Sequence, residues 1–383
     1  MSVSAGAVSH ERLCAWAYLS AVVEPPAPAS YGFVAVHGAE IAADRIRSGN
    51  VPGAVVNETA ARREHVCGAE LLERAHRSGI RLVTPEHGEW PGSRSAFLEG
   101  ATEVGLSGLA APMALWCRGN VSPEAVSRSA VAVVGARAAT GYGESCAAEL
   151  GYELARSGTT VVSGAAYGID GAAHRGALAA GGATAAILAC GPELDYPAGH
   201  ARLIARIAEN GLVCSEYPPG TPPRKHRFLV RNRLIAAVTD GTVVVEAGLR
   251  SGAGNTATTT DTLGLPVMAV PGPVTSANSS GCHELIRSGK AVLVTGAPDV
   301  LELVSDIGTA RAPEREPTPR PTDELDEVSK RVHDSLSPTR RRTVEQLVHE
   351  TGITRKSVVT CLSALEISGF VRCDDRGWTR CDQ

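Results

Sequence analysis

The densest group of chemically useful side chains in this sequence is a basic stretch that follows Pro222 and Pro223. Residues 224–233 hold five Lys or Arg residues and one aromatic ring, Phe228, although the whole chain has a net charge of −4. Cations neutralise phosphates and an aromatic ring stacks on a base, so this combination favours binding of a single nucleic-acid strand. A basic helix face that only meets solvent is the alternative interpretation.

Three further segments have the pattern of anion-binding loops, because each is rich in small residues, follows an apolar run and precedes a predicted helix. They are 135–144 with Gly135 and Arg137, 163–170 with Ser163 and Gly164, and 249–258 with Ser251 and Gly252. Helix N-termini bind phosphates, and parallel strands bring their carboxyl ends to one sheet edge. We therefore expect these loops and the basic stretch to form one phosphate-binding rim. For the first loop, a turn that needs glycine only for its backbone is the alternative.

Four ionisable side chains near these loops raise the question of acid–base catalysis. Asp170 and His174 lie four positions apart on a predicted helix, where a capping carboxylate and a packed histidine are the better interpretation. Glu216 and Glu246 each follow a strand without a recognisable catalytic partner. The sequence has no P-loop, zinc-protease or nucleophile-elbow spacing and no His/Cys cluster at metal spacing. We therefore predict no catalytic residue, no bound metal and no cofactor.

The elements that must position these residues follow an α/β pattern. Nine short apolar runs, most of them continuous rather than alternating, are typical of strands buried on both faces. The runs are Ile80–Thr84, Met113–Cys117, Ala130–Val134, Thr159–Val162, Thr184–Leu188, Leu212–Cys214, Thr242–Val245, Pro266–Val270 and Val292–Val294. Helical segments between them are 143–157, 169–180, 199–210 and 256–263. This alternation predicts an α/β fold: an extended Rossmann-like, largely parallel sheet with helices on both faces.

The two ends of the chain lack the strand–helix alternation of the middle part. Near the N-terminus, helices are expected at 11–21, 40–48 and 70–78; near the C-terminus, helices at 343–351 and 354–368 precede a hairpin. The expected domains are therefore 1–78, a small helical accessory domain of SAM-like or helix-hairpin-like type; 79–307, the Rossmann-like domain; 308–325, a Pro-rich linker; and 326–383, a winged helix.

The chain is expected to work in the cytoplasm. Its N-terminus lacks the basic start and apolar run of a signal peptide, and no stretch of about 18 apolar residues predicts a membrane-spanning helix. The ten cysteines are spread singly without a C-x-x-C pair, as expected for small buried side chains in a reducing compartment. We therefore predict a cytoplasmic protein with no membrane contact.

The loops and the basic stretch together resemble the DNA-processing protein A (DprA/Smf) family over roughly residues 110–306. The resembling segments are VAVVGAR (131–137), SGAAYGID (163–170), SEYPPGTPP (215–223), the F-x-x-R-N-R-x-I-A pattern (228–236), VVVEAGLRSG (243–252) and AVPGPVTSANSSGCHELIRSG (269–289). A helical N-terminal region and a C-terminal winged helix are also familiar additions in this family.

This resemblance implies a non-catalytic protein that binds single-stranded DNA, protects it and loads the RecA recombinase onto it during DNA processing or natural transformation. It also implies a homodimer. By motif match, Arg137 would contact a phosphate, Lys225 would be the basic contact, and Phe228 would stack on a base. The residues that would shape the pocket are Arg231, Asn232 and Arg233.

The chain departs from the family pattern at four places. Ala136 stands where Ser is common, Tyr167 where Arg is common, Leu229 where Pro is frequent, and 253–255 replaces a bulkier Ser-Leu-Ile segment. The lost arginine removes one phosphate neutraliser, which predicts weaker and less salt-sensitive DNA binding. Stacking by Tyr167 would partly offset that loss.

Two other functions compete with this interpretation. Rossmann-like nucleotide phosphoribohydrolases of the LOG type use a P-G-G-x-G-T-x-x-E motif, but the nearest stretch, 251–260, has no Glu at the matching position. Separately, the winged helix could read duplex DNA through Arg355 and Lys356 at the start of its second helix. A protein contact or a weak DNA contact is at least as well supported by so few cations.

Overall fold

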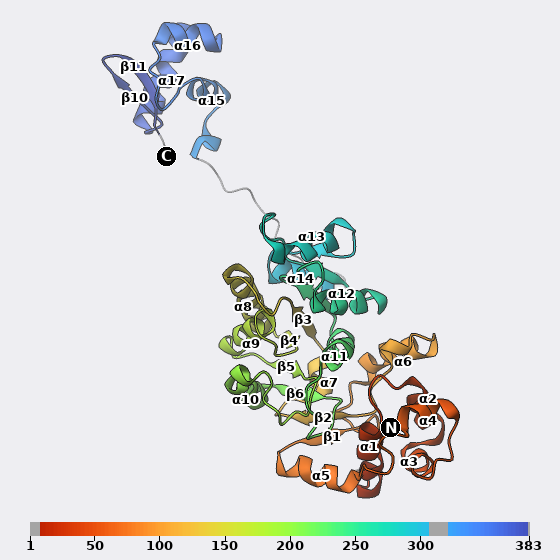
Figure 1. Cartoon of the computed structure of the whole chain (residues 1–383). Helices are drawn as coiled ribbons and strands as arrows, with labels where there is room; N and C mark the ends of the chain where they lie inside the picture. The colour runs from red at the N-terminus through yellow and green to blue at the C-terminus, as the bar shows by residue number, and fades with distance from the viewer. Residues whose placement is uncertain (1–7, 306–320, 382–383) are drawn as a thin grey trace, which may run out of the picture. The chain divides into compact units, whose positions relative to one another are not determined.

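The computed structural model describes residues 8–305 and 321–381 (Figure 1). The chain divides into two compact units, 1–313 and 314–383. Most of the expected Pro-rich linker, 308–325, therefore lies outside the described residues, and its end contains a short 3-10 helix, η4 (Pro321–Glu324).

A nine-stranded sheet organises the first unit, in the order β1-β2-β6-β5-β4-β3-β7-β8-β9. The strands are β1 (Arg81–Val83), β2 (Leu115–Arg118), β3 (Ala130–Val134), β4 (Thr160–Ser163), β5 (Thr184–Ile187), β6 (Leu212–Ser215), β7 (Gly241–Val244), β8 (Val267–Ala269) and β9 (Val292–Leu293). Neighbours from β6 to β9 in this order are parallel, whereas β2 is antiparallel to both β1 and β6. The predicted largely parallel, Rossmann-like sheet and its nine strands are confirmed.

Helices cover both faces of the sheet, as predicted (Figure 1). One face carries α8 (Gly141–Arg156), α9 (Ile169–Ala179), α10 (Ala201–Asn210) and α14 (Ala297–Val304). The other carries α6 (Gly92–Glu103), α7 (Pro123–Ser127), α11 (Lys225–Ala237), α12 (Gly252–Thr262) and α13 (Ser280–Arg287). The chain order reverses between β3 and β7, which is the position where doubly wound sheets usually bind ligands.

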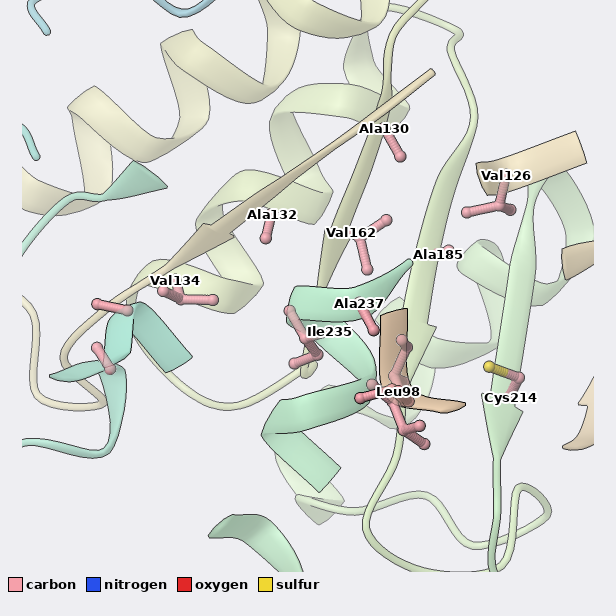
Figure 2. Close-up of a cluster of buried hydrophobic side chains, with 14 of the residues drawn as sticks. Leu98, Val126, Ala130, Ala132, Val134, Val162, Ala185, Cys214, Ile235 and Ala237 are labelled. Carbon is pink, nitrogen blue, oxygen red and sulfur yellow. The ribbon is translucent and has the colours of Figure 1, made fainter. Parts of the chain in front are cut away.

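The main core lies between the second face of the sheet and its helices. Figure 2 shows side chains of the sheet, such as Ala132 and Val162, together with Leu98 of α6 and Ile235 of α11. Small Ala and Val side chains on the strands let the helices pack closely against the sheet.

Five helices at the N-terminus pack on the antiparallel end of the sheet. They are α1 (His10–Val22), α2 (Pro28–His37), α3 (Ala39–Ser48), α4 (Gly53–Thr59) and α5 (Gly68–Arg77). Because side chains alternate along β2, Trp116 faces these helices while Leu115 and Cys117 face the main core. The Trp116 indole N–H donates to Ser20 Oγ at 3.3 Å. The expected domain border at residue 78 thus falls inside one compact unit.

The second unit has the predicted winged-helix arrangement. It consists of α15 (Glu327–Asp334), α16 (Val344–Thr351), α17 (Arg355–Ile367) and an antiparallel hairpin of β10 (Val371–Asp374) and β11 (Gly377–Arg380). Leu347, Val358 and Leu362 are fully buried between the helices. Thr343 and Gln346 form a reciprocal capping box that fixes the start of α16.

Eight helices were not predicted from the sequence pattern: α2, α4, α6, α7, α13, α14, α15 and, most importantly, α11. The basic stretch forms the first turns of α11, and three of its arginines are buried rather than exposed: Arg227, Arg231 and Arg233. A helix that buries charged side chains shows no apolar stripe, so the usual helical pattern is absent from its sequence.

A buried ion pair attaches α11 to the end of β6. Arg233 and Glu216 are 2% and 3% exposed, and the two guanidinium Nη atoms donate to the two carboxylate oxygens at 2.6 Å each. Arg233 Nε also donates to the carbonyl of Ala110 at 2.8 Å, which fixes the segment before β2. Glu216 therefore has a structural role, as the sequence analysis expected.

We predict that Arg233→Met lowers the free energy of unfolding by about 3–5 kcal/mol, because it leaves the Glu216 carboxylate buried without its partner. Urea unfolding monitored by circular dichroism measures the change. The matched control is Arg287→Met, whose side chain is 79% exposed and whose loss should cost less than about 0.5 kcal/mol. Equal stability of the two variants would contradict the structural role of the pair.

A second carboxylate connects the N-terminal helices to α11. Glu24 pairs with Arg62, with Arg227 at 2.7 Å and with His226 at 3.0 Å. Burial alone would raise the pKa of Glu24, but hydrogen bonds from Arg227, Arg62 and His226 outweigh it and lower the pKa from 4.5 to about 2. The carboxylate therefore stays ionised well into the acid range.

We expect Glu24→Gln to lower stability by about 1–2 kcal/mol at pH 7. Because the folded-state pKa is depressed, this contribution is complete above the ordinary pKa of 4.5 and is lost as the pH falls toward about 2. The unfolding free energies of the wild type and of Glu24→Gln should therefore become more similar as the pH falls through that window. Glu64→Gln, at a side chain 72% exposed, serves as the control. A difference that does not change with pH would refute the ionic origin.

Candidate nucleic-acid interface

A small pocket opens at the carboxyl ends of β3, β4 and β5, beneath the start of α11. Its cavity volume is about 50 Å³. The lining residues are Arg137, Gly164, Ala166, Tyr167, Leu188, Ala189, Cys190, Tyr196, Pro197 and Phe228. The structure thus brings together Arg137 of the first loop, Gly164 of the second and Phe228 of the basic stretch, as the rim hypothesis requires.

Aromatic rings and one guanidinium form the mouth of this pocket. The Phe228 ring lies 5.5 Å from the Tyr196 ring, centroid to centroid, and the Arg137 guanidinium carbon lies 4.7 Å from the Phe228 centroid. Arg137 is exposed, so its charge remains available to a phosphate while its plane lies against the ring. This arrangement can stack a planar base and neutralise a neighbouring phosphate.

Tyr167 lines the same pocket as Arg137 and Phe228. It is 48% exposed, and its hydroxyl accepts a hydrogen bond from the Gly199 N–H at 3.2 Å. Its ring meets His200 edge-on at 4.8 Å. The position that is commonly Arg therefore offers an aromatic surface here.

Sequence reasoning misses Tyr196, because the loop after β5 was not considered as part of the rim. The available signal was an aromatic residue in a Tyr-Pro-Ala-Gly segment shortly after an apolar run. Loops that follow neighbouring parallel strands share one edge of the sheet, so this loop belongs with the others.

Arg231 supports the pocket from below. Its side chain is buried and donates to the carbonyl of Gly164 at 3.1 Å and to the carbonyl of Ile187. A Cβ at Gly164 would lie 2.3 Å from the Arg231 Nη2, so the guanidinium fits only beneath a glycine. Arg231 therefore shapes the pocket, as its motif position implied, but does not reach its surface.

His174 is packed in the core as expected, whereas Asp170 holds the preceding loop instead of capping α9. The Asp170 carboxylate accepts from the N–H of Gly164 at 3.1 Å and of Ala166 at 3.4 Å, which holds the second loop. His174 Nδ1 lies 2.7 Å from Thr184 Oγ1. Burial lowers the pKa of His174 to about 3, so its imidazole is neutral near pH 7.

The first loop does not offer its helix N-terminus to a phosphate. Glu246 accepts hydrogen bonds from the Thr140 N–H at 2.9 Å and from the Thr140 hydroxyl at 2.6 Å, directly before α8 begins. A Cβ at Gly143 would lie 2.4 Å from this carboxylate, and one at Gly135 would lie 2.5 Å from the Ile169 side chain. The expectation of a phosphate here is corrected: the anion at this position is the protein's own carboxylate.

Two more expected contact residues, Ser163 and Asn232, are buried. The Ser163 hydroxyl donates to the Val133 carbonyl at 2.7 Å, and Asn232 donates to the Gly252 carbonyl at 3.3 Å. Ser251 is partly exposed, and its hydroxyl accepts from the Gly254 N–H at 3.4 Å, which caps the start of α12.

The basic stretch contributes fewer free cations than its composition suggests. Arg227 is engaged by Glu24, Arg231 by carbonyls and Arg233 by Glu216. Lys225, the first residue of α11, and Arg224 before it are exposed and form no ion pair in the described part of the chain. The exposed rim cations that form no ion pair in the described part of the chain are therefore Arg137, Arg224, Lys225 and Arg250.

Some cations of the winged helix are paired within their own unit. Arg341 pairs with Asp374 at 2.6 Å, Arg342 with Glu350 at 3.2 Å, and Arg355 with Glu345 at 3.4 Å. Lys356 is exposed next to Arg355. A duplex-DNA contact through α17 therefore stays a prediction.

Over the two described ranges, no group of three or more His, Cys, Asp or Glu side chains is arranged to hold a metal ion. None of the helices described is long and apolar enough to cross a membrane.

Comparison with known proteins identifies the family of the chain. Residues 82–305 match the family of DNA recombination-mediator protein A, and residues 316–375 match the DprA winged-helix domain. The chain is 47% identical to a putative DNA processing protein DprA of Mycobacterium tuberculosis, over 95% of this chain and 93% of that protein. It is 35% identical to protein Smf of Escherichia coli, over 70% and 72% of the two chains.

A solved structure is also similar. The X-ray structure of DprA from Streptococcus pneumoniae aligns with a TM-score of 0.63 at 28% identity, covering 80% of this chain and all of that one. With family matches over both units and relatives that align over most of its length, this chain belongs to the DNA-processing protein A (DprA/Smf) family.

Proposed function

We propose that this protein binds single-stranded DNA along the rim, with a base in the pocket between Phe228, Tyr196 and Tyr167. Arg137 and Lys225 would neutralise the flanking phosphates. The observation that carries this proposal is the contact of the exposed Arg137 guanidinium with the Phe228 ring at the mouth of the pocket. Stacking surfaces beside unpaired cations suit a flexible single strand, whose bases are free to turn into a pocket.

The proposed activity is binding without catalysis. The carboxylates that might have served as general bases, Glu216 and Glu246, are held by Arg233 and Thr140. A phosphoribohydrolase reaction would need a free carboxylate at the bound nucleotide. This favours the binding function over the LOG-type alternative.

We further propose that the protein is a cytoplasmic recombination mediator, which protects single strands and delivers them to the RecA recombinase during DNA processing or natural transformation. The match to DNA recombination-mediator protein A supports this role. A homodimer forms part of the proposal, supported by the open edge of the sheet at β9, where Val292 and Leu293 are 50% and 47% exposed.

Removing the stacking ring should weaken binding most. We expect Phe228→Ala to lower the affinity for an oligo-dT strand about tenfold, because one base–aromatic stack contributes about 1–3 kcal/mol. Arg137→Ala and Lys225→Ala should each weaken binding less than Phe228→Ala. Each should also reduce the slope of log affinity against log salt concentration by about one, because one phosphate contact is lost. Fluorescence anisotropy over a salt series measures both quantities.

The matched control for Arg137 is Arg156→Ala. Arg156 is also exposed, but it lies at the last turn of α8, at the far end of that helix from the pocket. This variant should bind like the wild type. Affinities that are unchanged in all three rim variants at moderate salt would remove the basis of the proposal.

The mediator role makes a separate prediction. The wild type should accelerate the assembly of RecA filaments on strands already covered by another single-strand-binding protein. Phe228→Ala should lose the acceleration in proportion to its lost DNA affinity, whereas Arg156→Ala should retain it. A wild type that binds strands but never accelerates RecA assembly would leave the binding function intact and reject the mediator role.

A further inference from the structure

A second cleft lies on the other side of the basic stretch. It has a cavity volume of about 340 Å³ and lies between the N-terminal helices and the loop 217–222 that follows β6. Its polar side chains include Arg62, His65, Arg74, Tyr217 and Arg227. None of these residues carries a role in the rim described above.

The second cleft is cationic. It is lined by three guanidinium groups and one carboxylate, that of Glu70. Arg62 and Arg227 share Glu24, whereas Arg74 forms no ion pair or hydrogen bond within the described residues. Arg74 extends to the loop, where its Nη1 lies 2.6 Å from the place of a Cβ on Gly220. An unpaired guanidinium in a concave site is suited to a phosphate.

Tyr217 supplies an independent observation. The residue is 2% exposed and lines the cleft, yet its hydroxyl has no hydrogen-bond partner among the described residues. Its ring lies beneath Arg227, whose guanidinium carbon is 4.9 Å from the centroid. A buried hydroxyl without a partner costs free energy, so a phenylalanine would suit this position better unless a ligand uses the O–H.

The two cavities are neighbours along the chain. Arg227 lines the second cleft, and Phe228, the next residue, lines the base pocket. The exposed Arg224 and Lys225 precede both on the same first turn of α11. A strand with a base on Phe228 therefore has the second cleft, which Arg227 and Arg74 line, adjacent to it along the chain.

We propose that the second cleft is a further subsite of the nucleic-acid interface, where Arg74 and Tyr217 bind a backbone phosphate of the same strand whose base occupies the Phe228 pocket. This proposal rests on the proposed single-strand function. It assigns the N-terminal helices a direct part in binding, through α5.

The test compares strand lengths. Arg74→Ala and Tyr217→Phe should each lower the affinity for a dT strand of about 12 nucleotides by about fivefold, and Arg74→Ala should reduce its salt slope by about one. A dT strand of about 3 nucleotides, which fills only the base pocket, should bind each variant like the wild type. Tyr217→Phe should not lower the melting temperature, because it removes an unpaired hydroxyl.

Arg77→Ala is the matched control. Arg77 is exposed on the same helix but does not line the second cleft, so the same loss of charge should leave both strands unaffected. Phe228→Ala should weaken both strands, which separates the two subsites. If the wild type bound neither strand, the single-strand function itself would fail.

Two outcomes would overturn the subsite while leaving that function standing. One is unchanged affinity of the longer strand for both Arg74→Ala and Tyr217→Phe. The other is a cleft that is specific for free nucleotides. In that case AMP, but not inorganic phosphate, would compete with the longer strand for the Arg74-dependent part of its binding, at AMP concentrations comparable to those of the strand. Weak competition by both small ligands is the result expected for a phosphate site that belongs to a strand.

Discussion

Two guanidinium groups buried on α11 hold the rim together. Arg233 is matched by Glu216, and Arg231 by the carbonyls at the ends of β4 and β5. A buried guanidinium is stable only when its N–H groups have hydrogen-bond partners, so these contacts fix the position of α11 over the sheet. Phe228 lies three residues before Arg231, on the same side of the helix, so the contacts that fix Arg231 also fix the position of Phe228. The pocket therefore depends on arginines that no ligand touches.

The protein uses the doubly wound sheet in an altered way. In such folds the helix N-termini beside the switch point usually receive phosphates. Here the Glu246 carboxylate occupies the start of α8, and the Ser251 hydroxyl caps α12. In the proposed function, recognition would instead use the loops after β3, β4 and β5, where rings and exposed cations would take the place of a backbone phosphate cradle. Such a surface is suited to a polymer with stacked bases more than to a nucleotide diphosphate.

The sheet could be predicted from the sequence because its strands are continuous apolar runs, and burial on both faces leaves that pattern directly in the residues. The grouping of Arg137, Gly164 and Phe228 followed from parallel strand ends sharing one edge. The state of the cations could not be predicted in the same way. Arg227 pairs with Glu24, 203 residues away, and Arg233 pairs with Glu216, 17 residues away and directly after β6. No helical spacing in the sequence indicates either partner. The number of cations in a sequence segment therefore does not show how many of them are free to contact a ligand.

The contacts of Glu24 make the N-terminal helices and the first turn of α11 a single cooperative unit. Arg62 and Arg227 come from the two sides and share one carboxylate, so neither side can open without breaking contacts of the other. Free-energy coupling of this kind is reciprocal. A ligand that orders the first turn of α11, as proposed, would also slow the opening of α1 and its neighbours, and hydrogen exchange of amides in these remote helices would then measure the occupancy of the pocket.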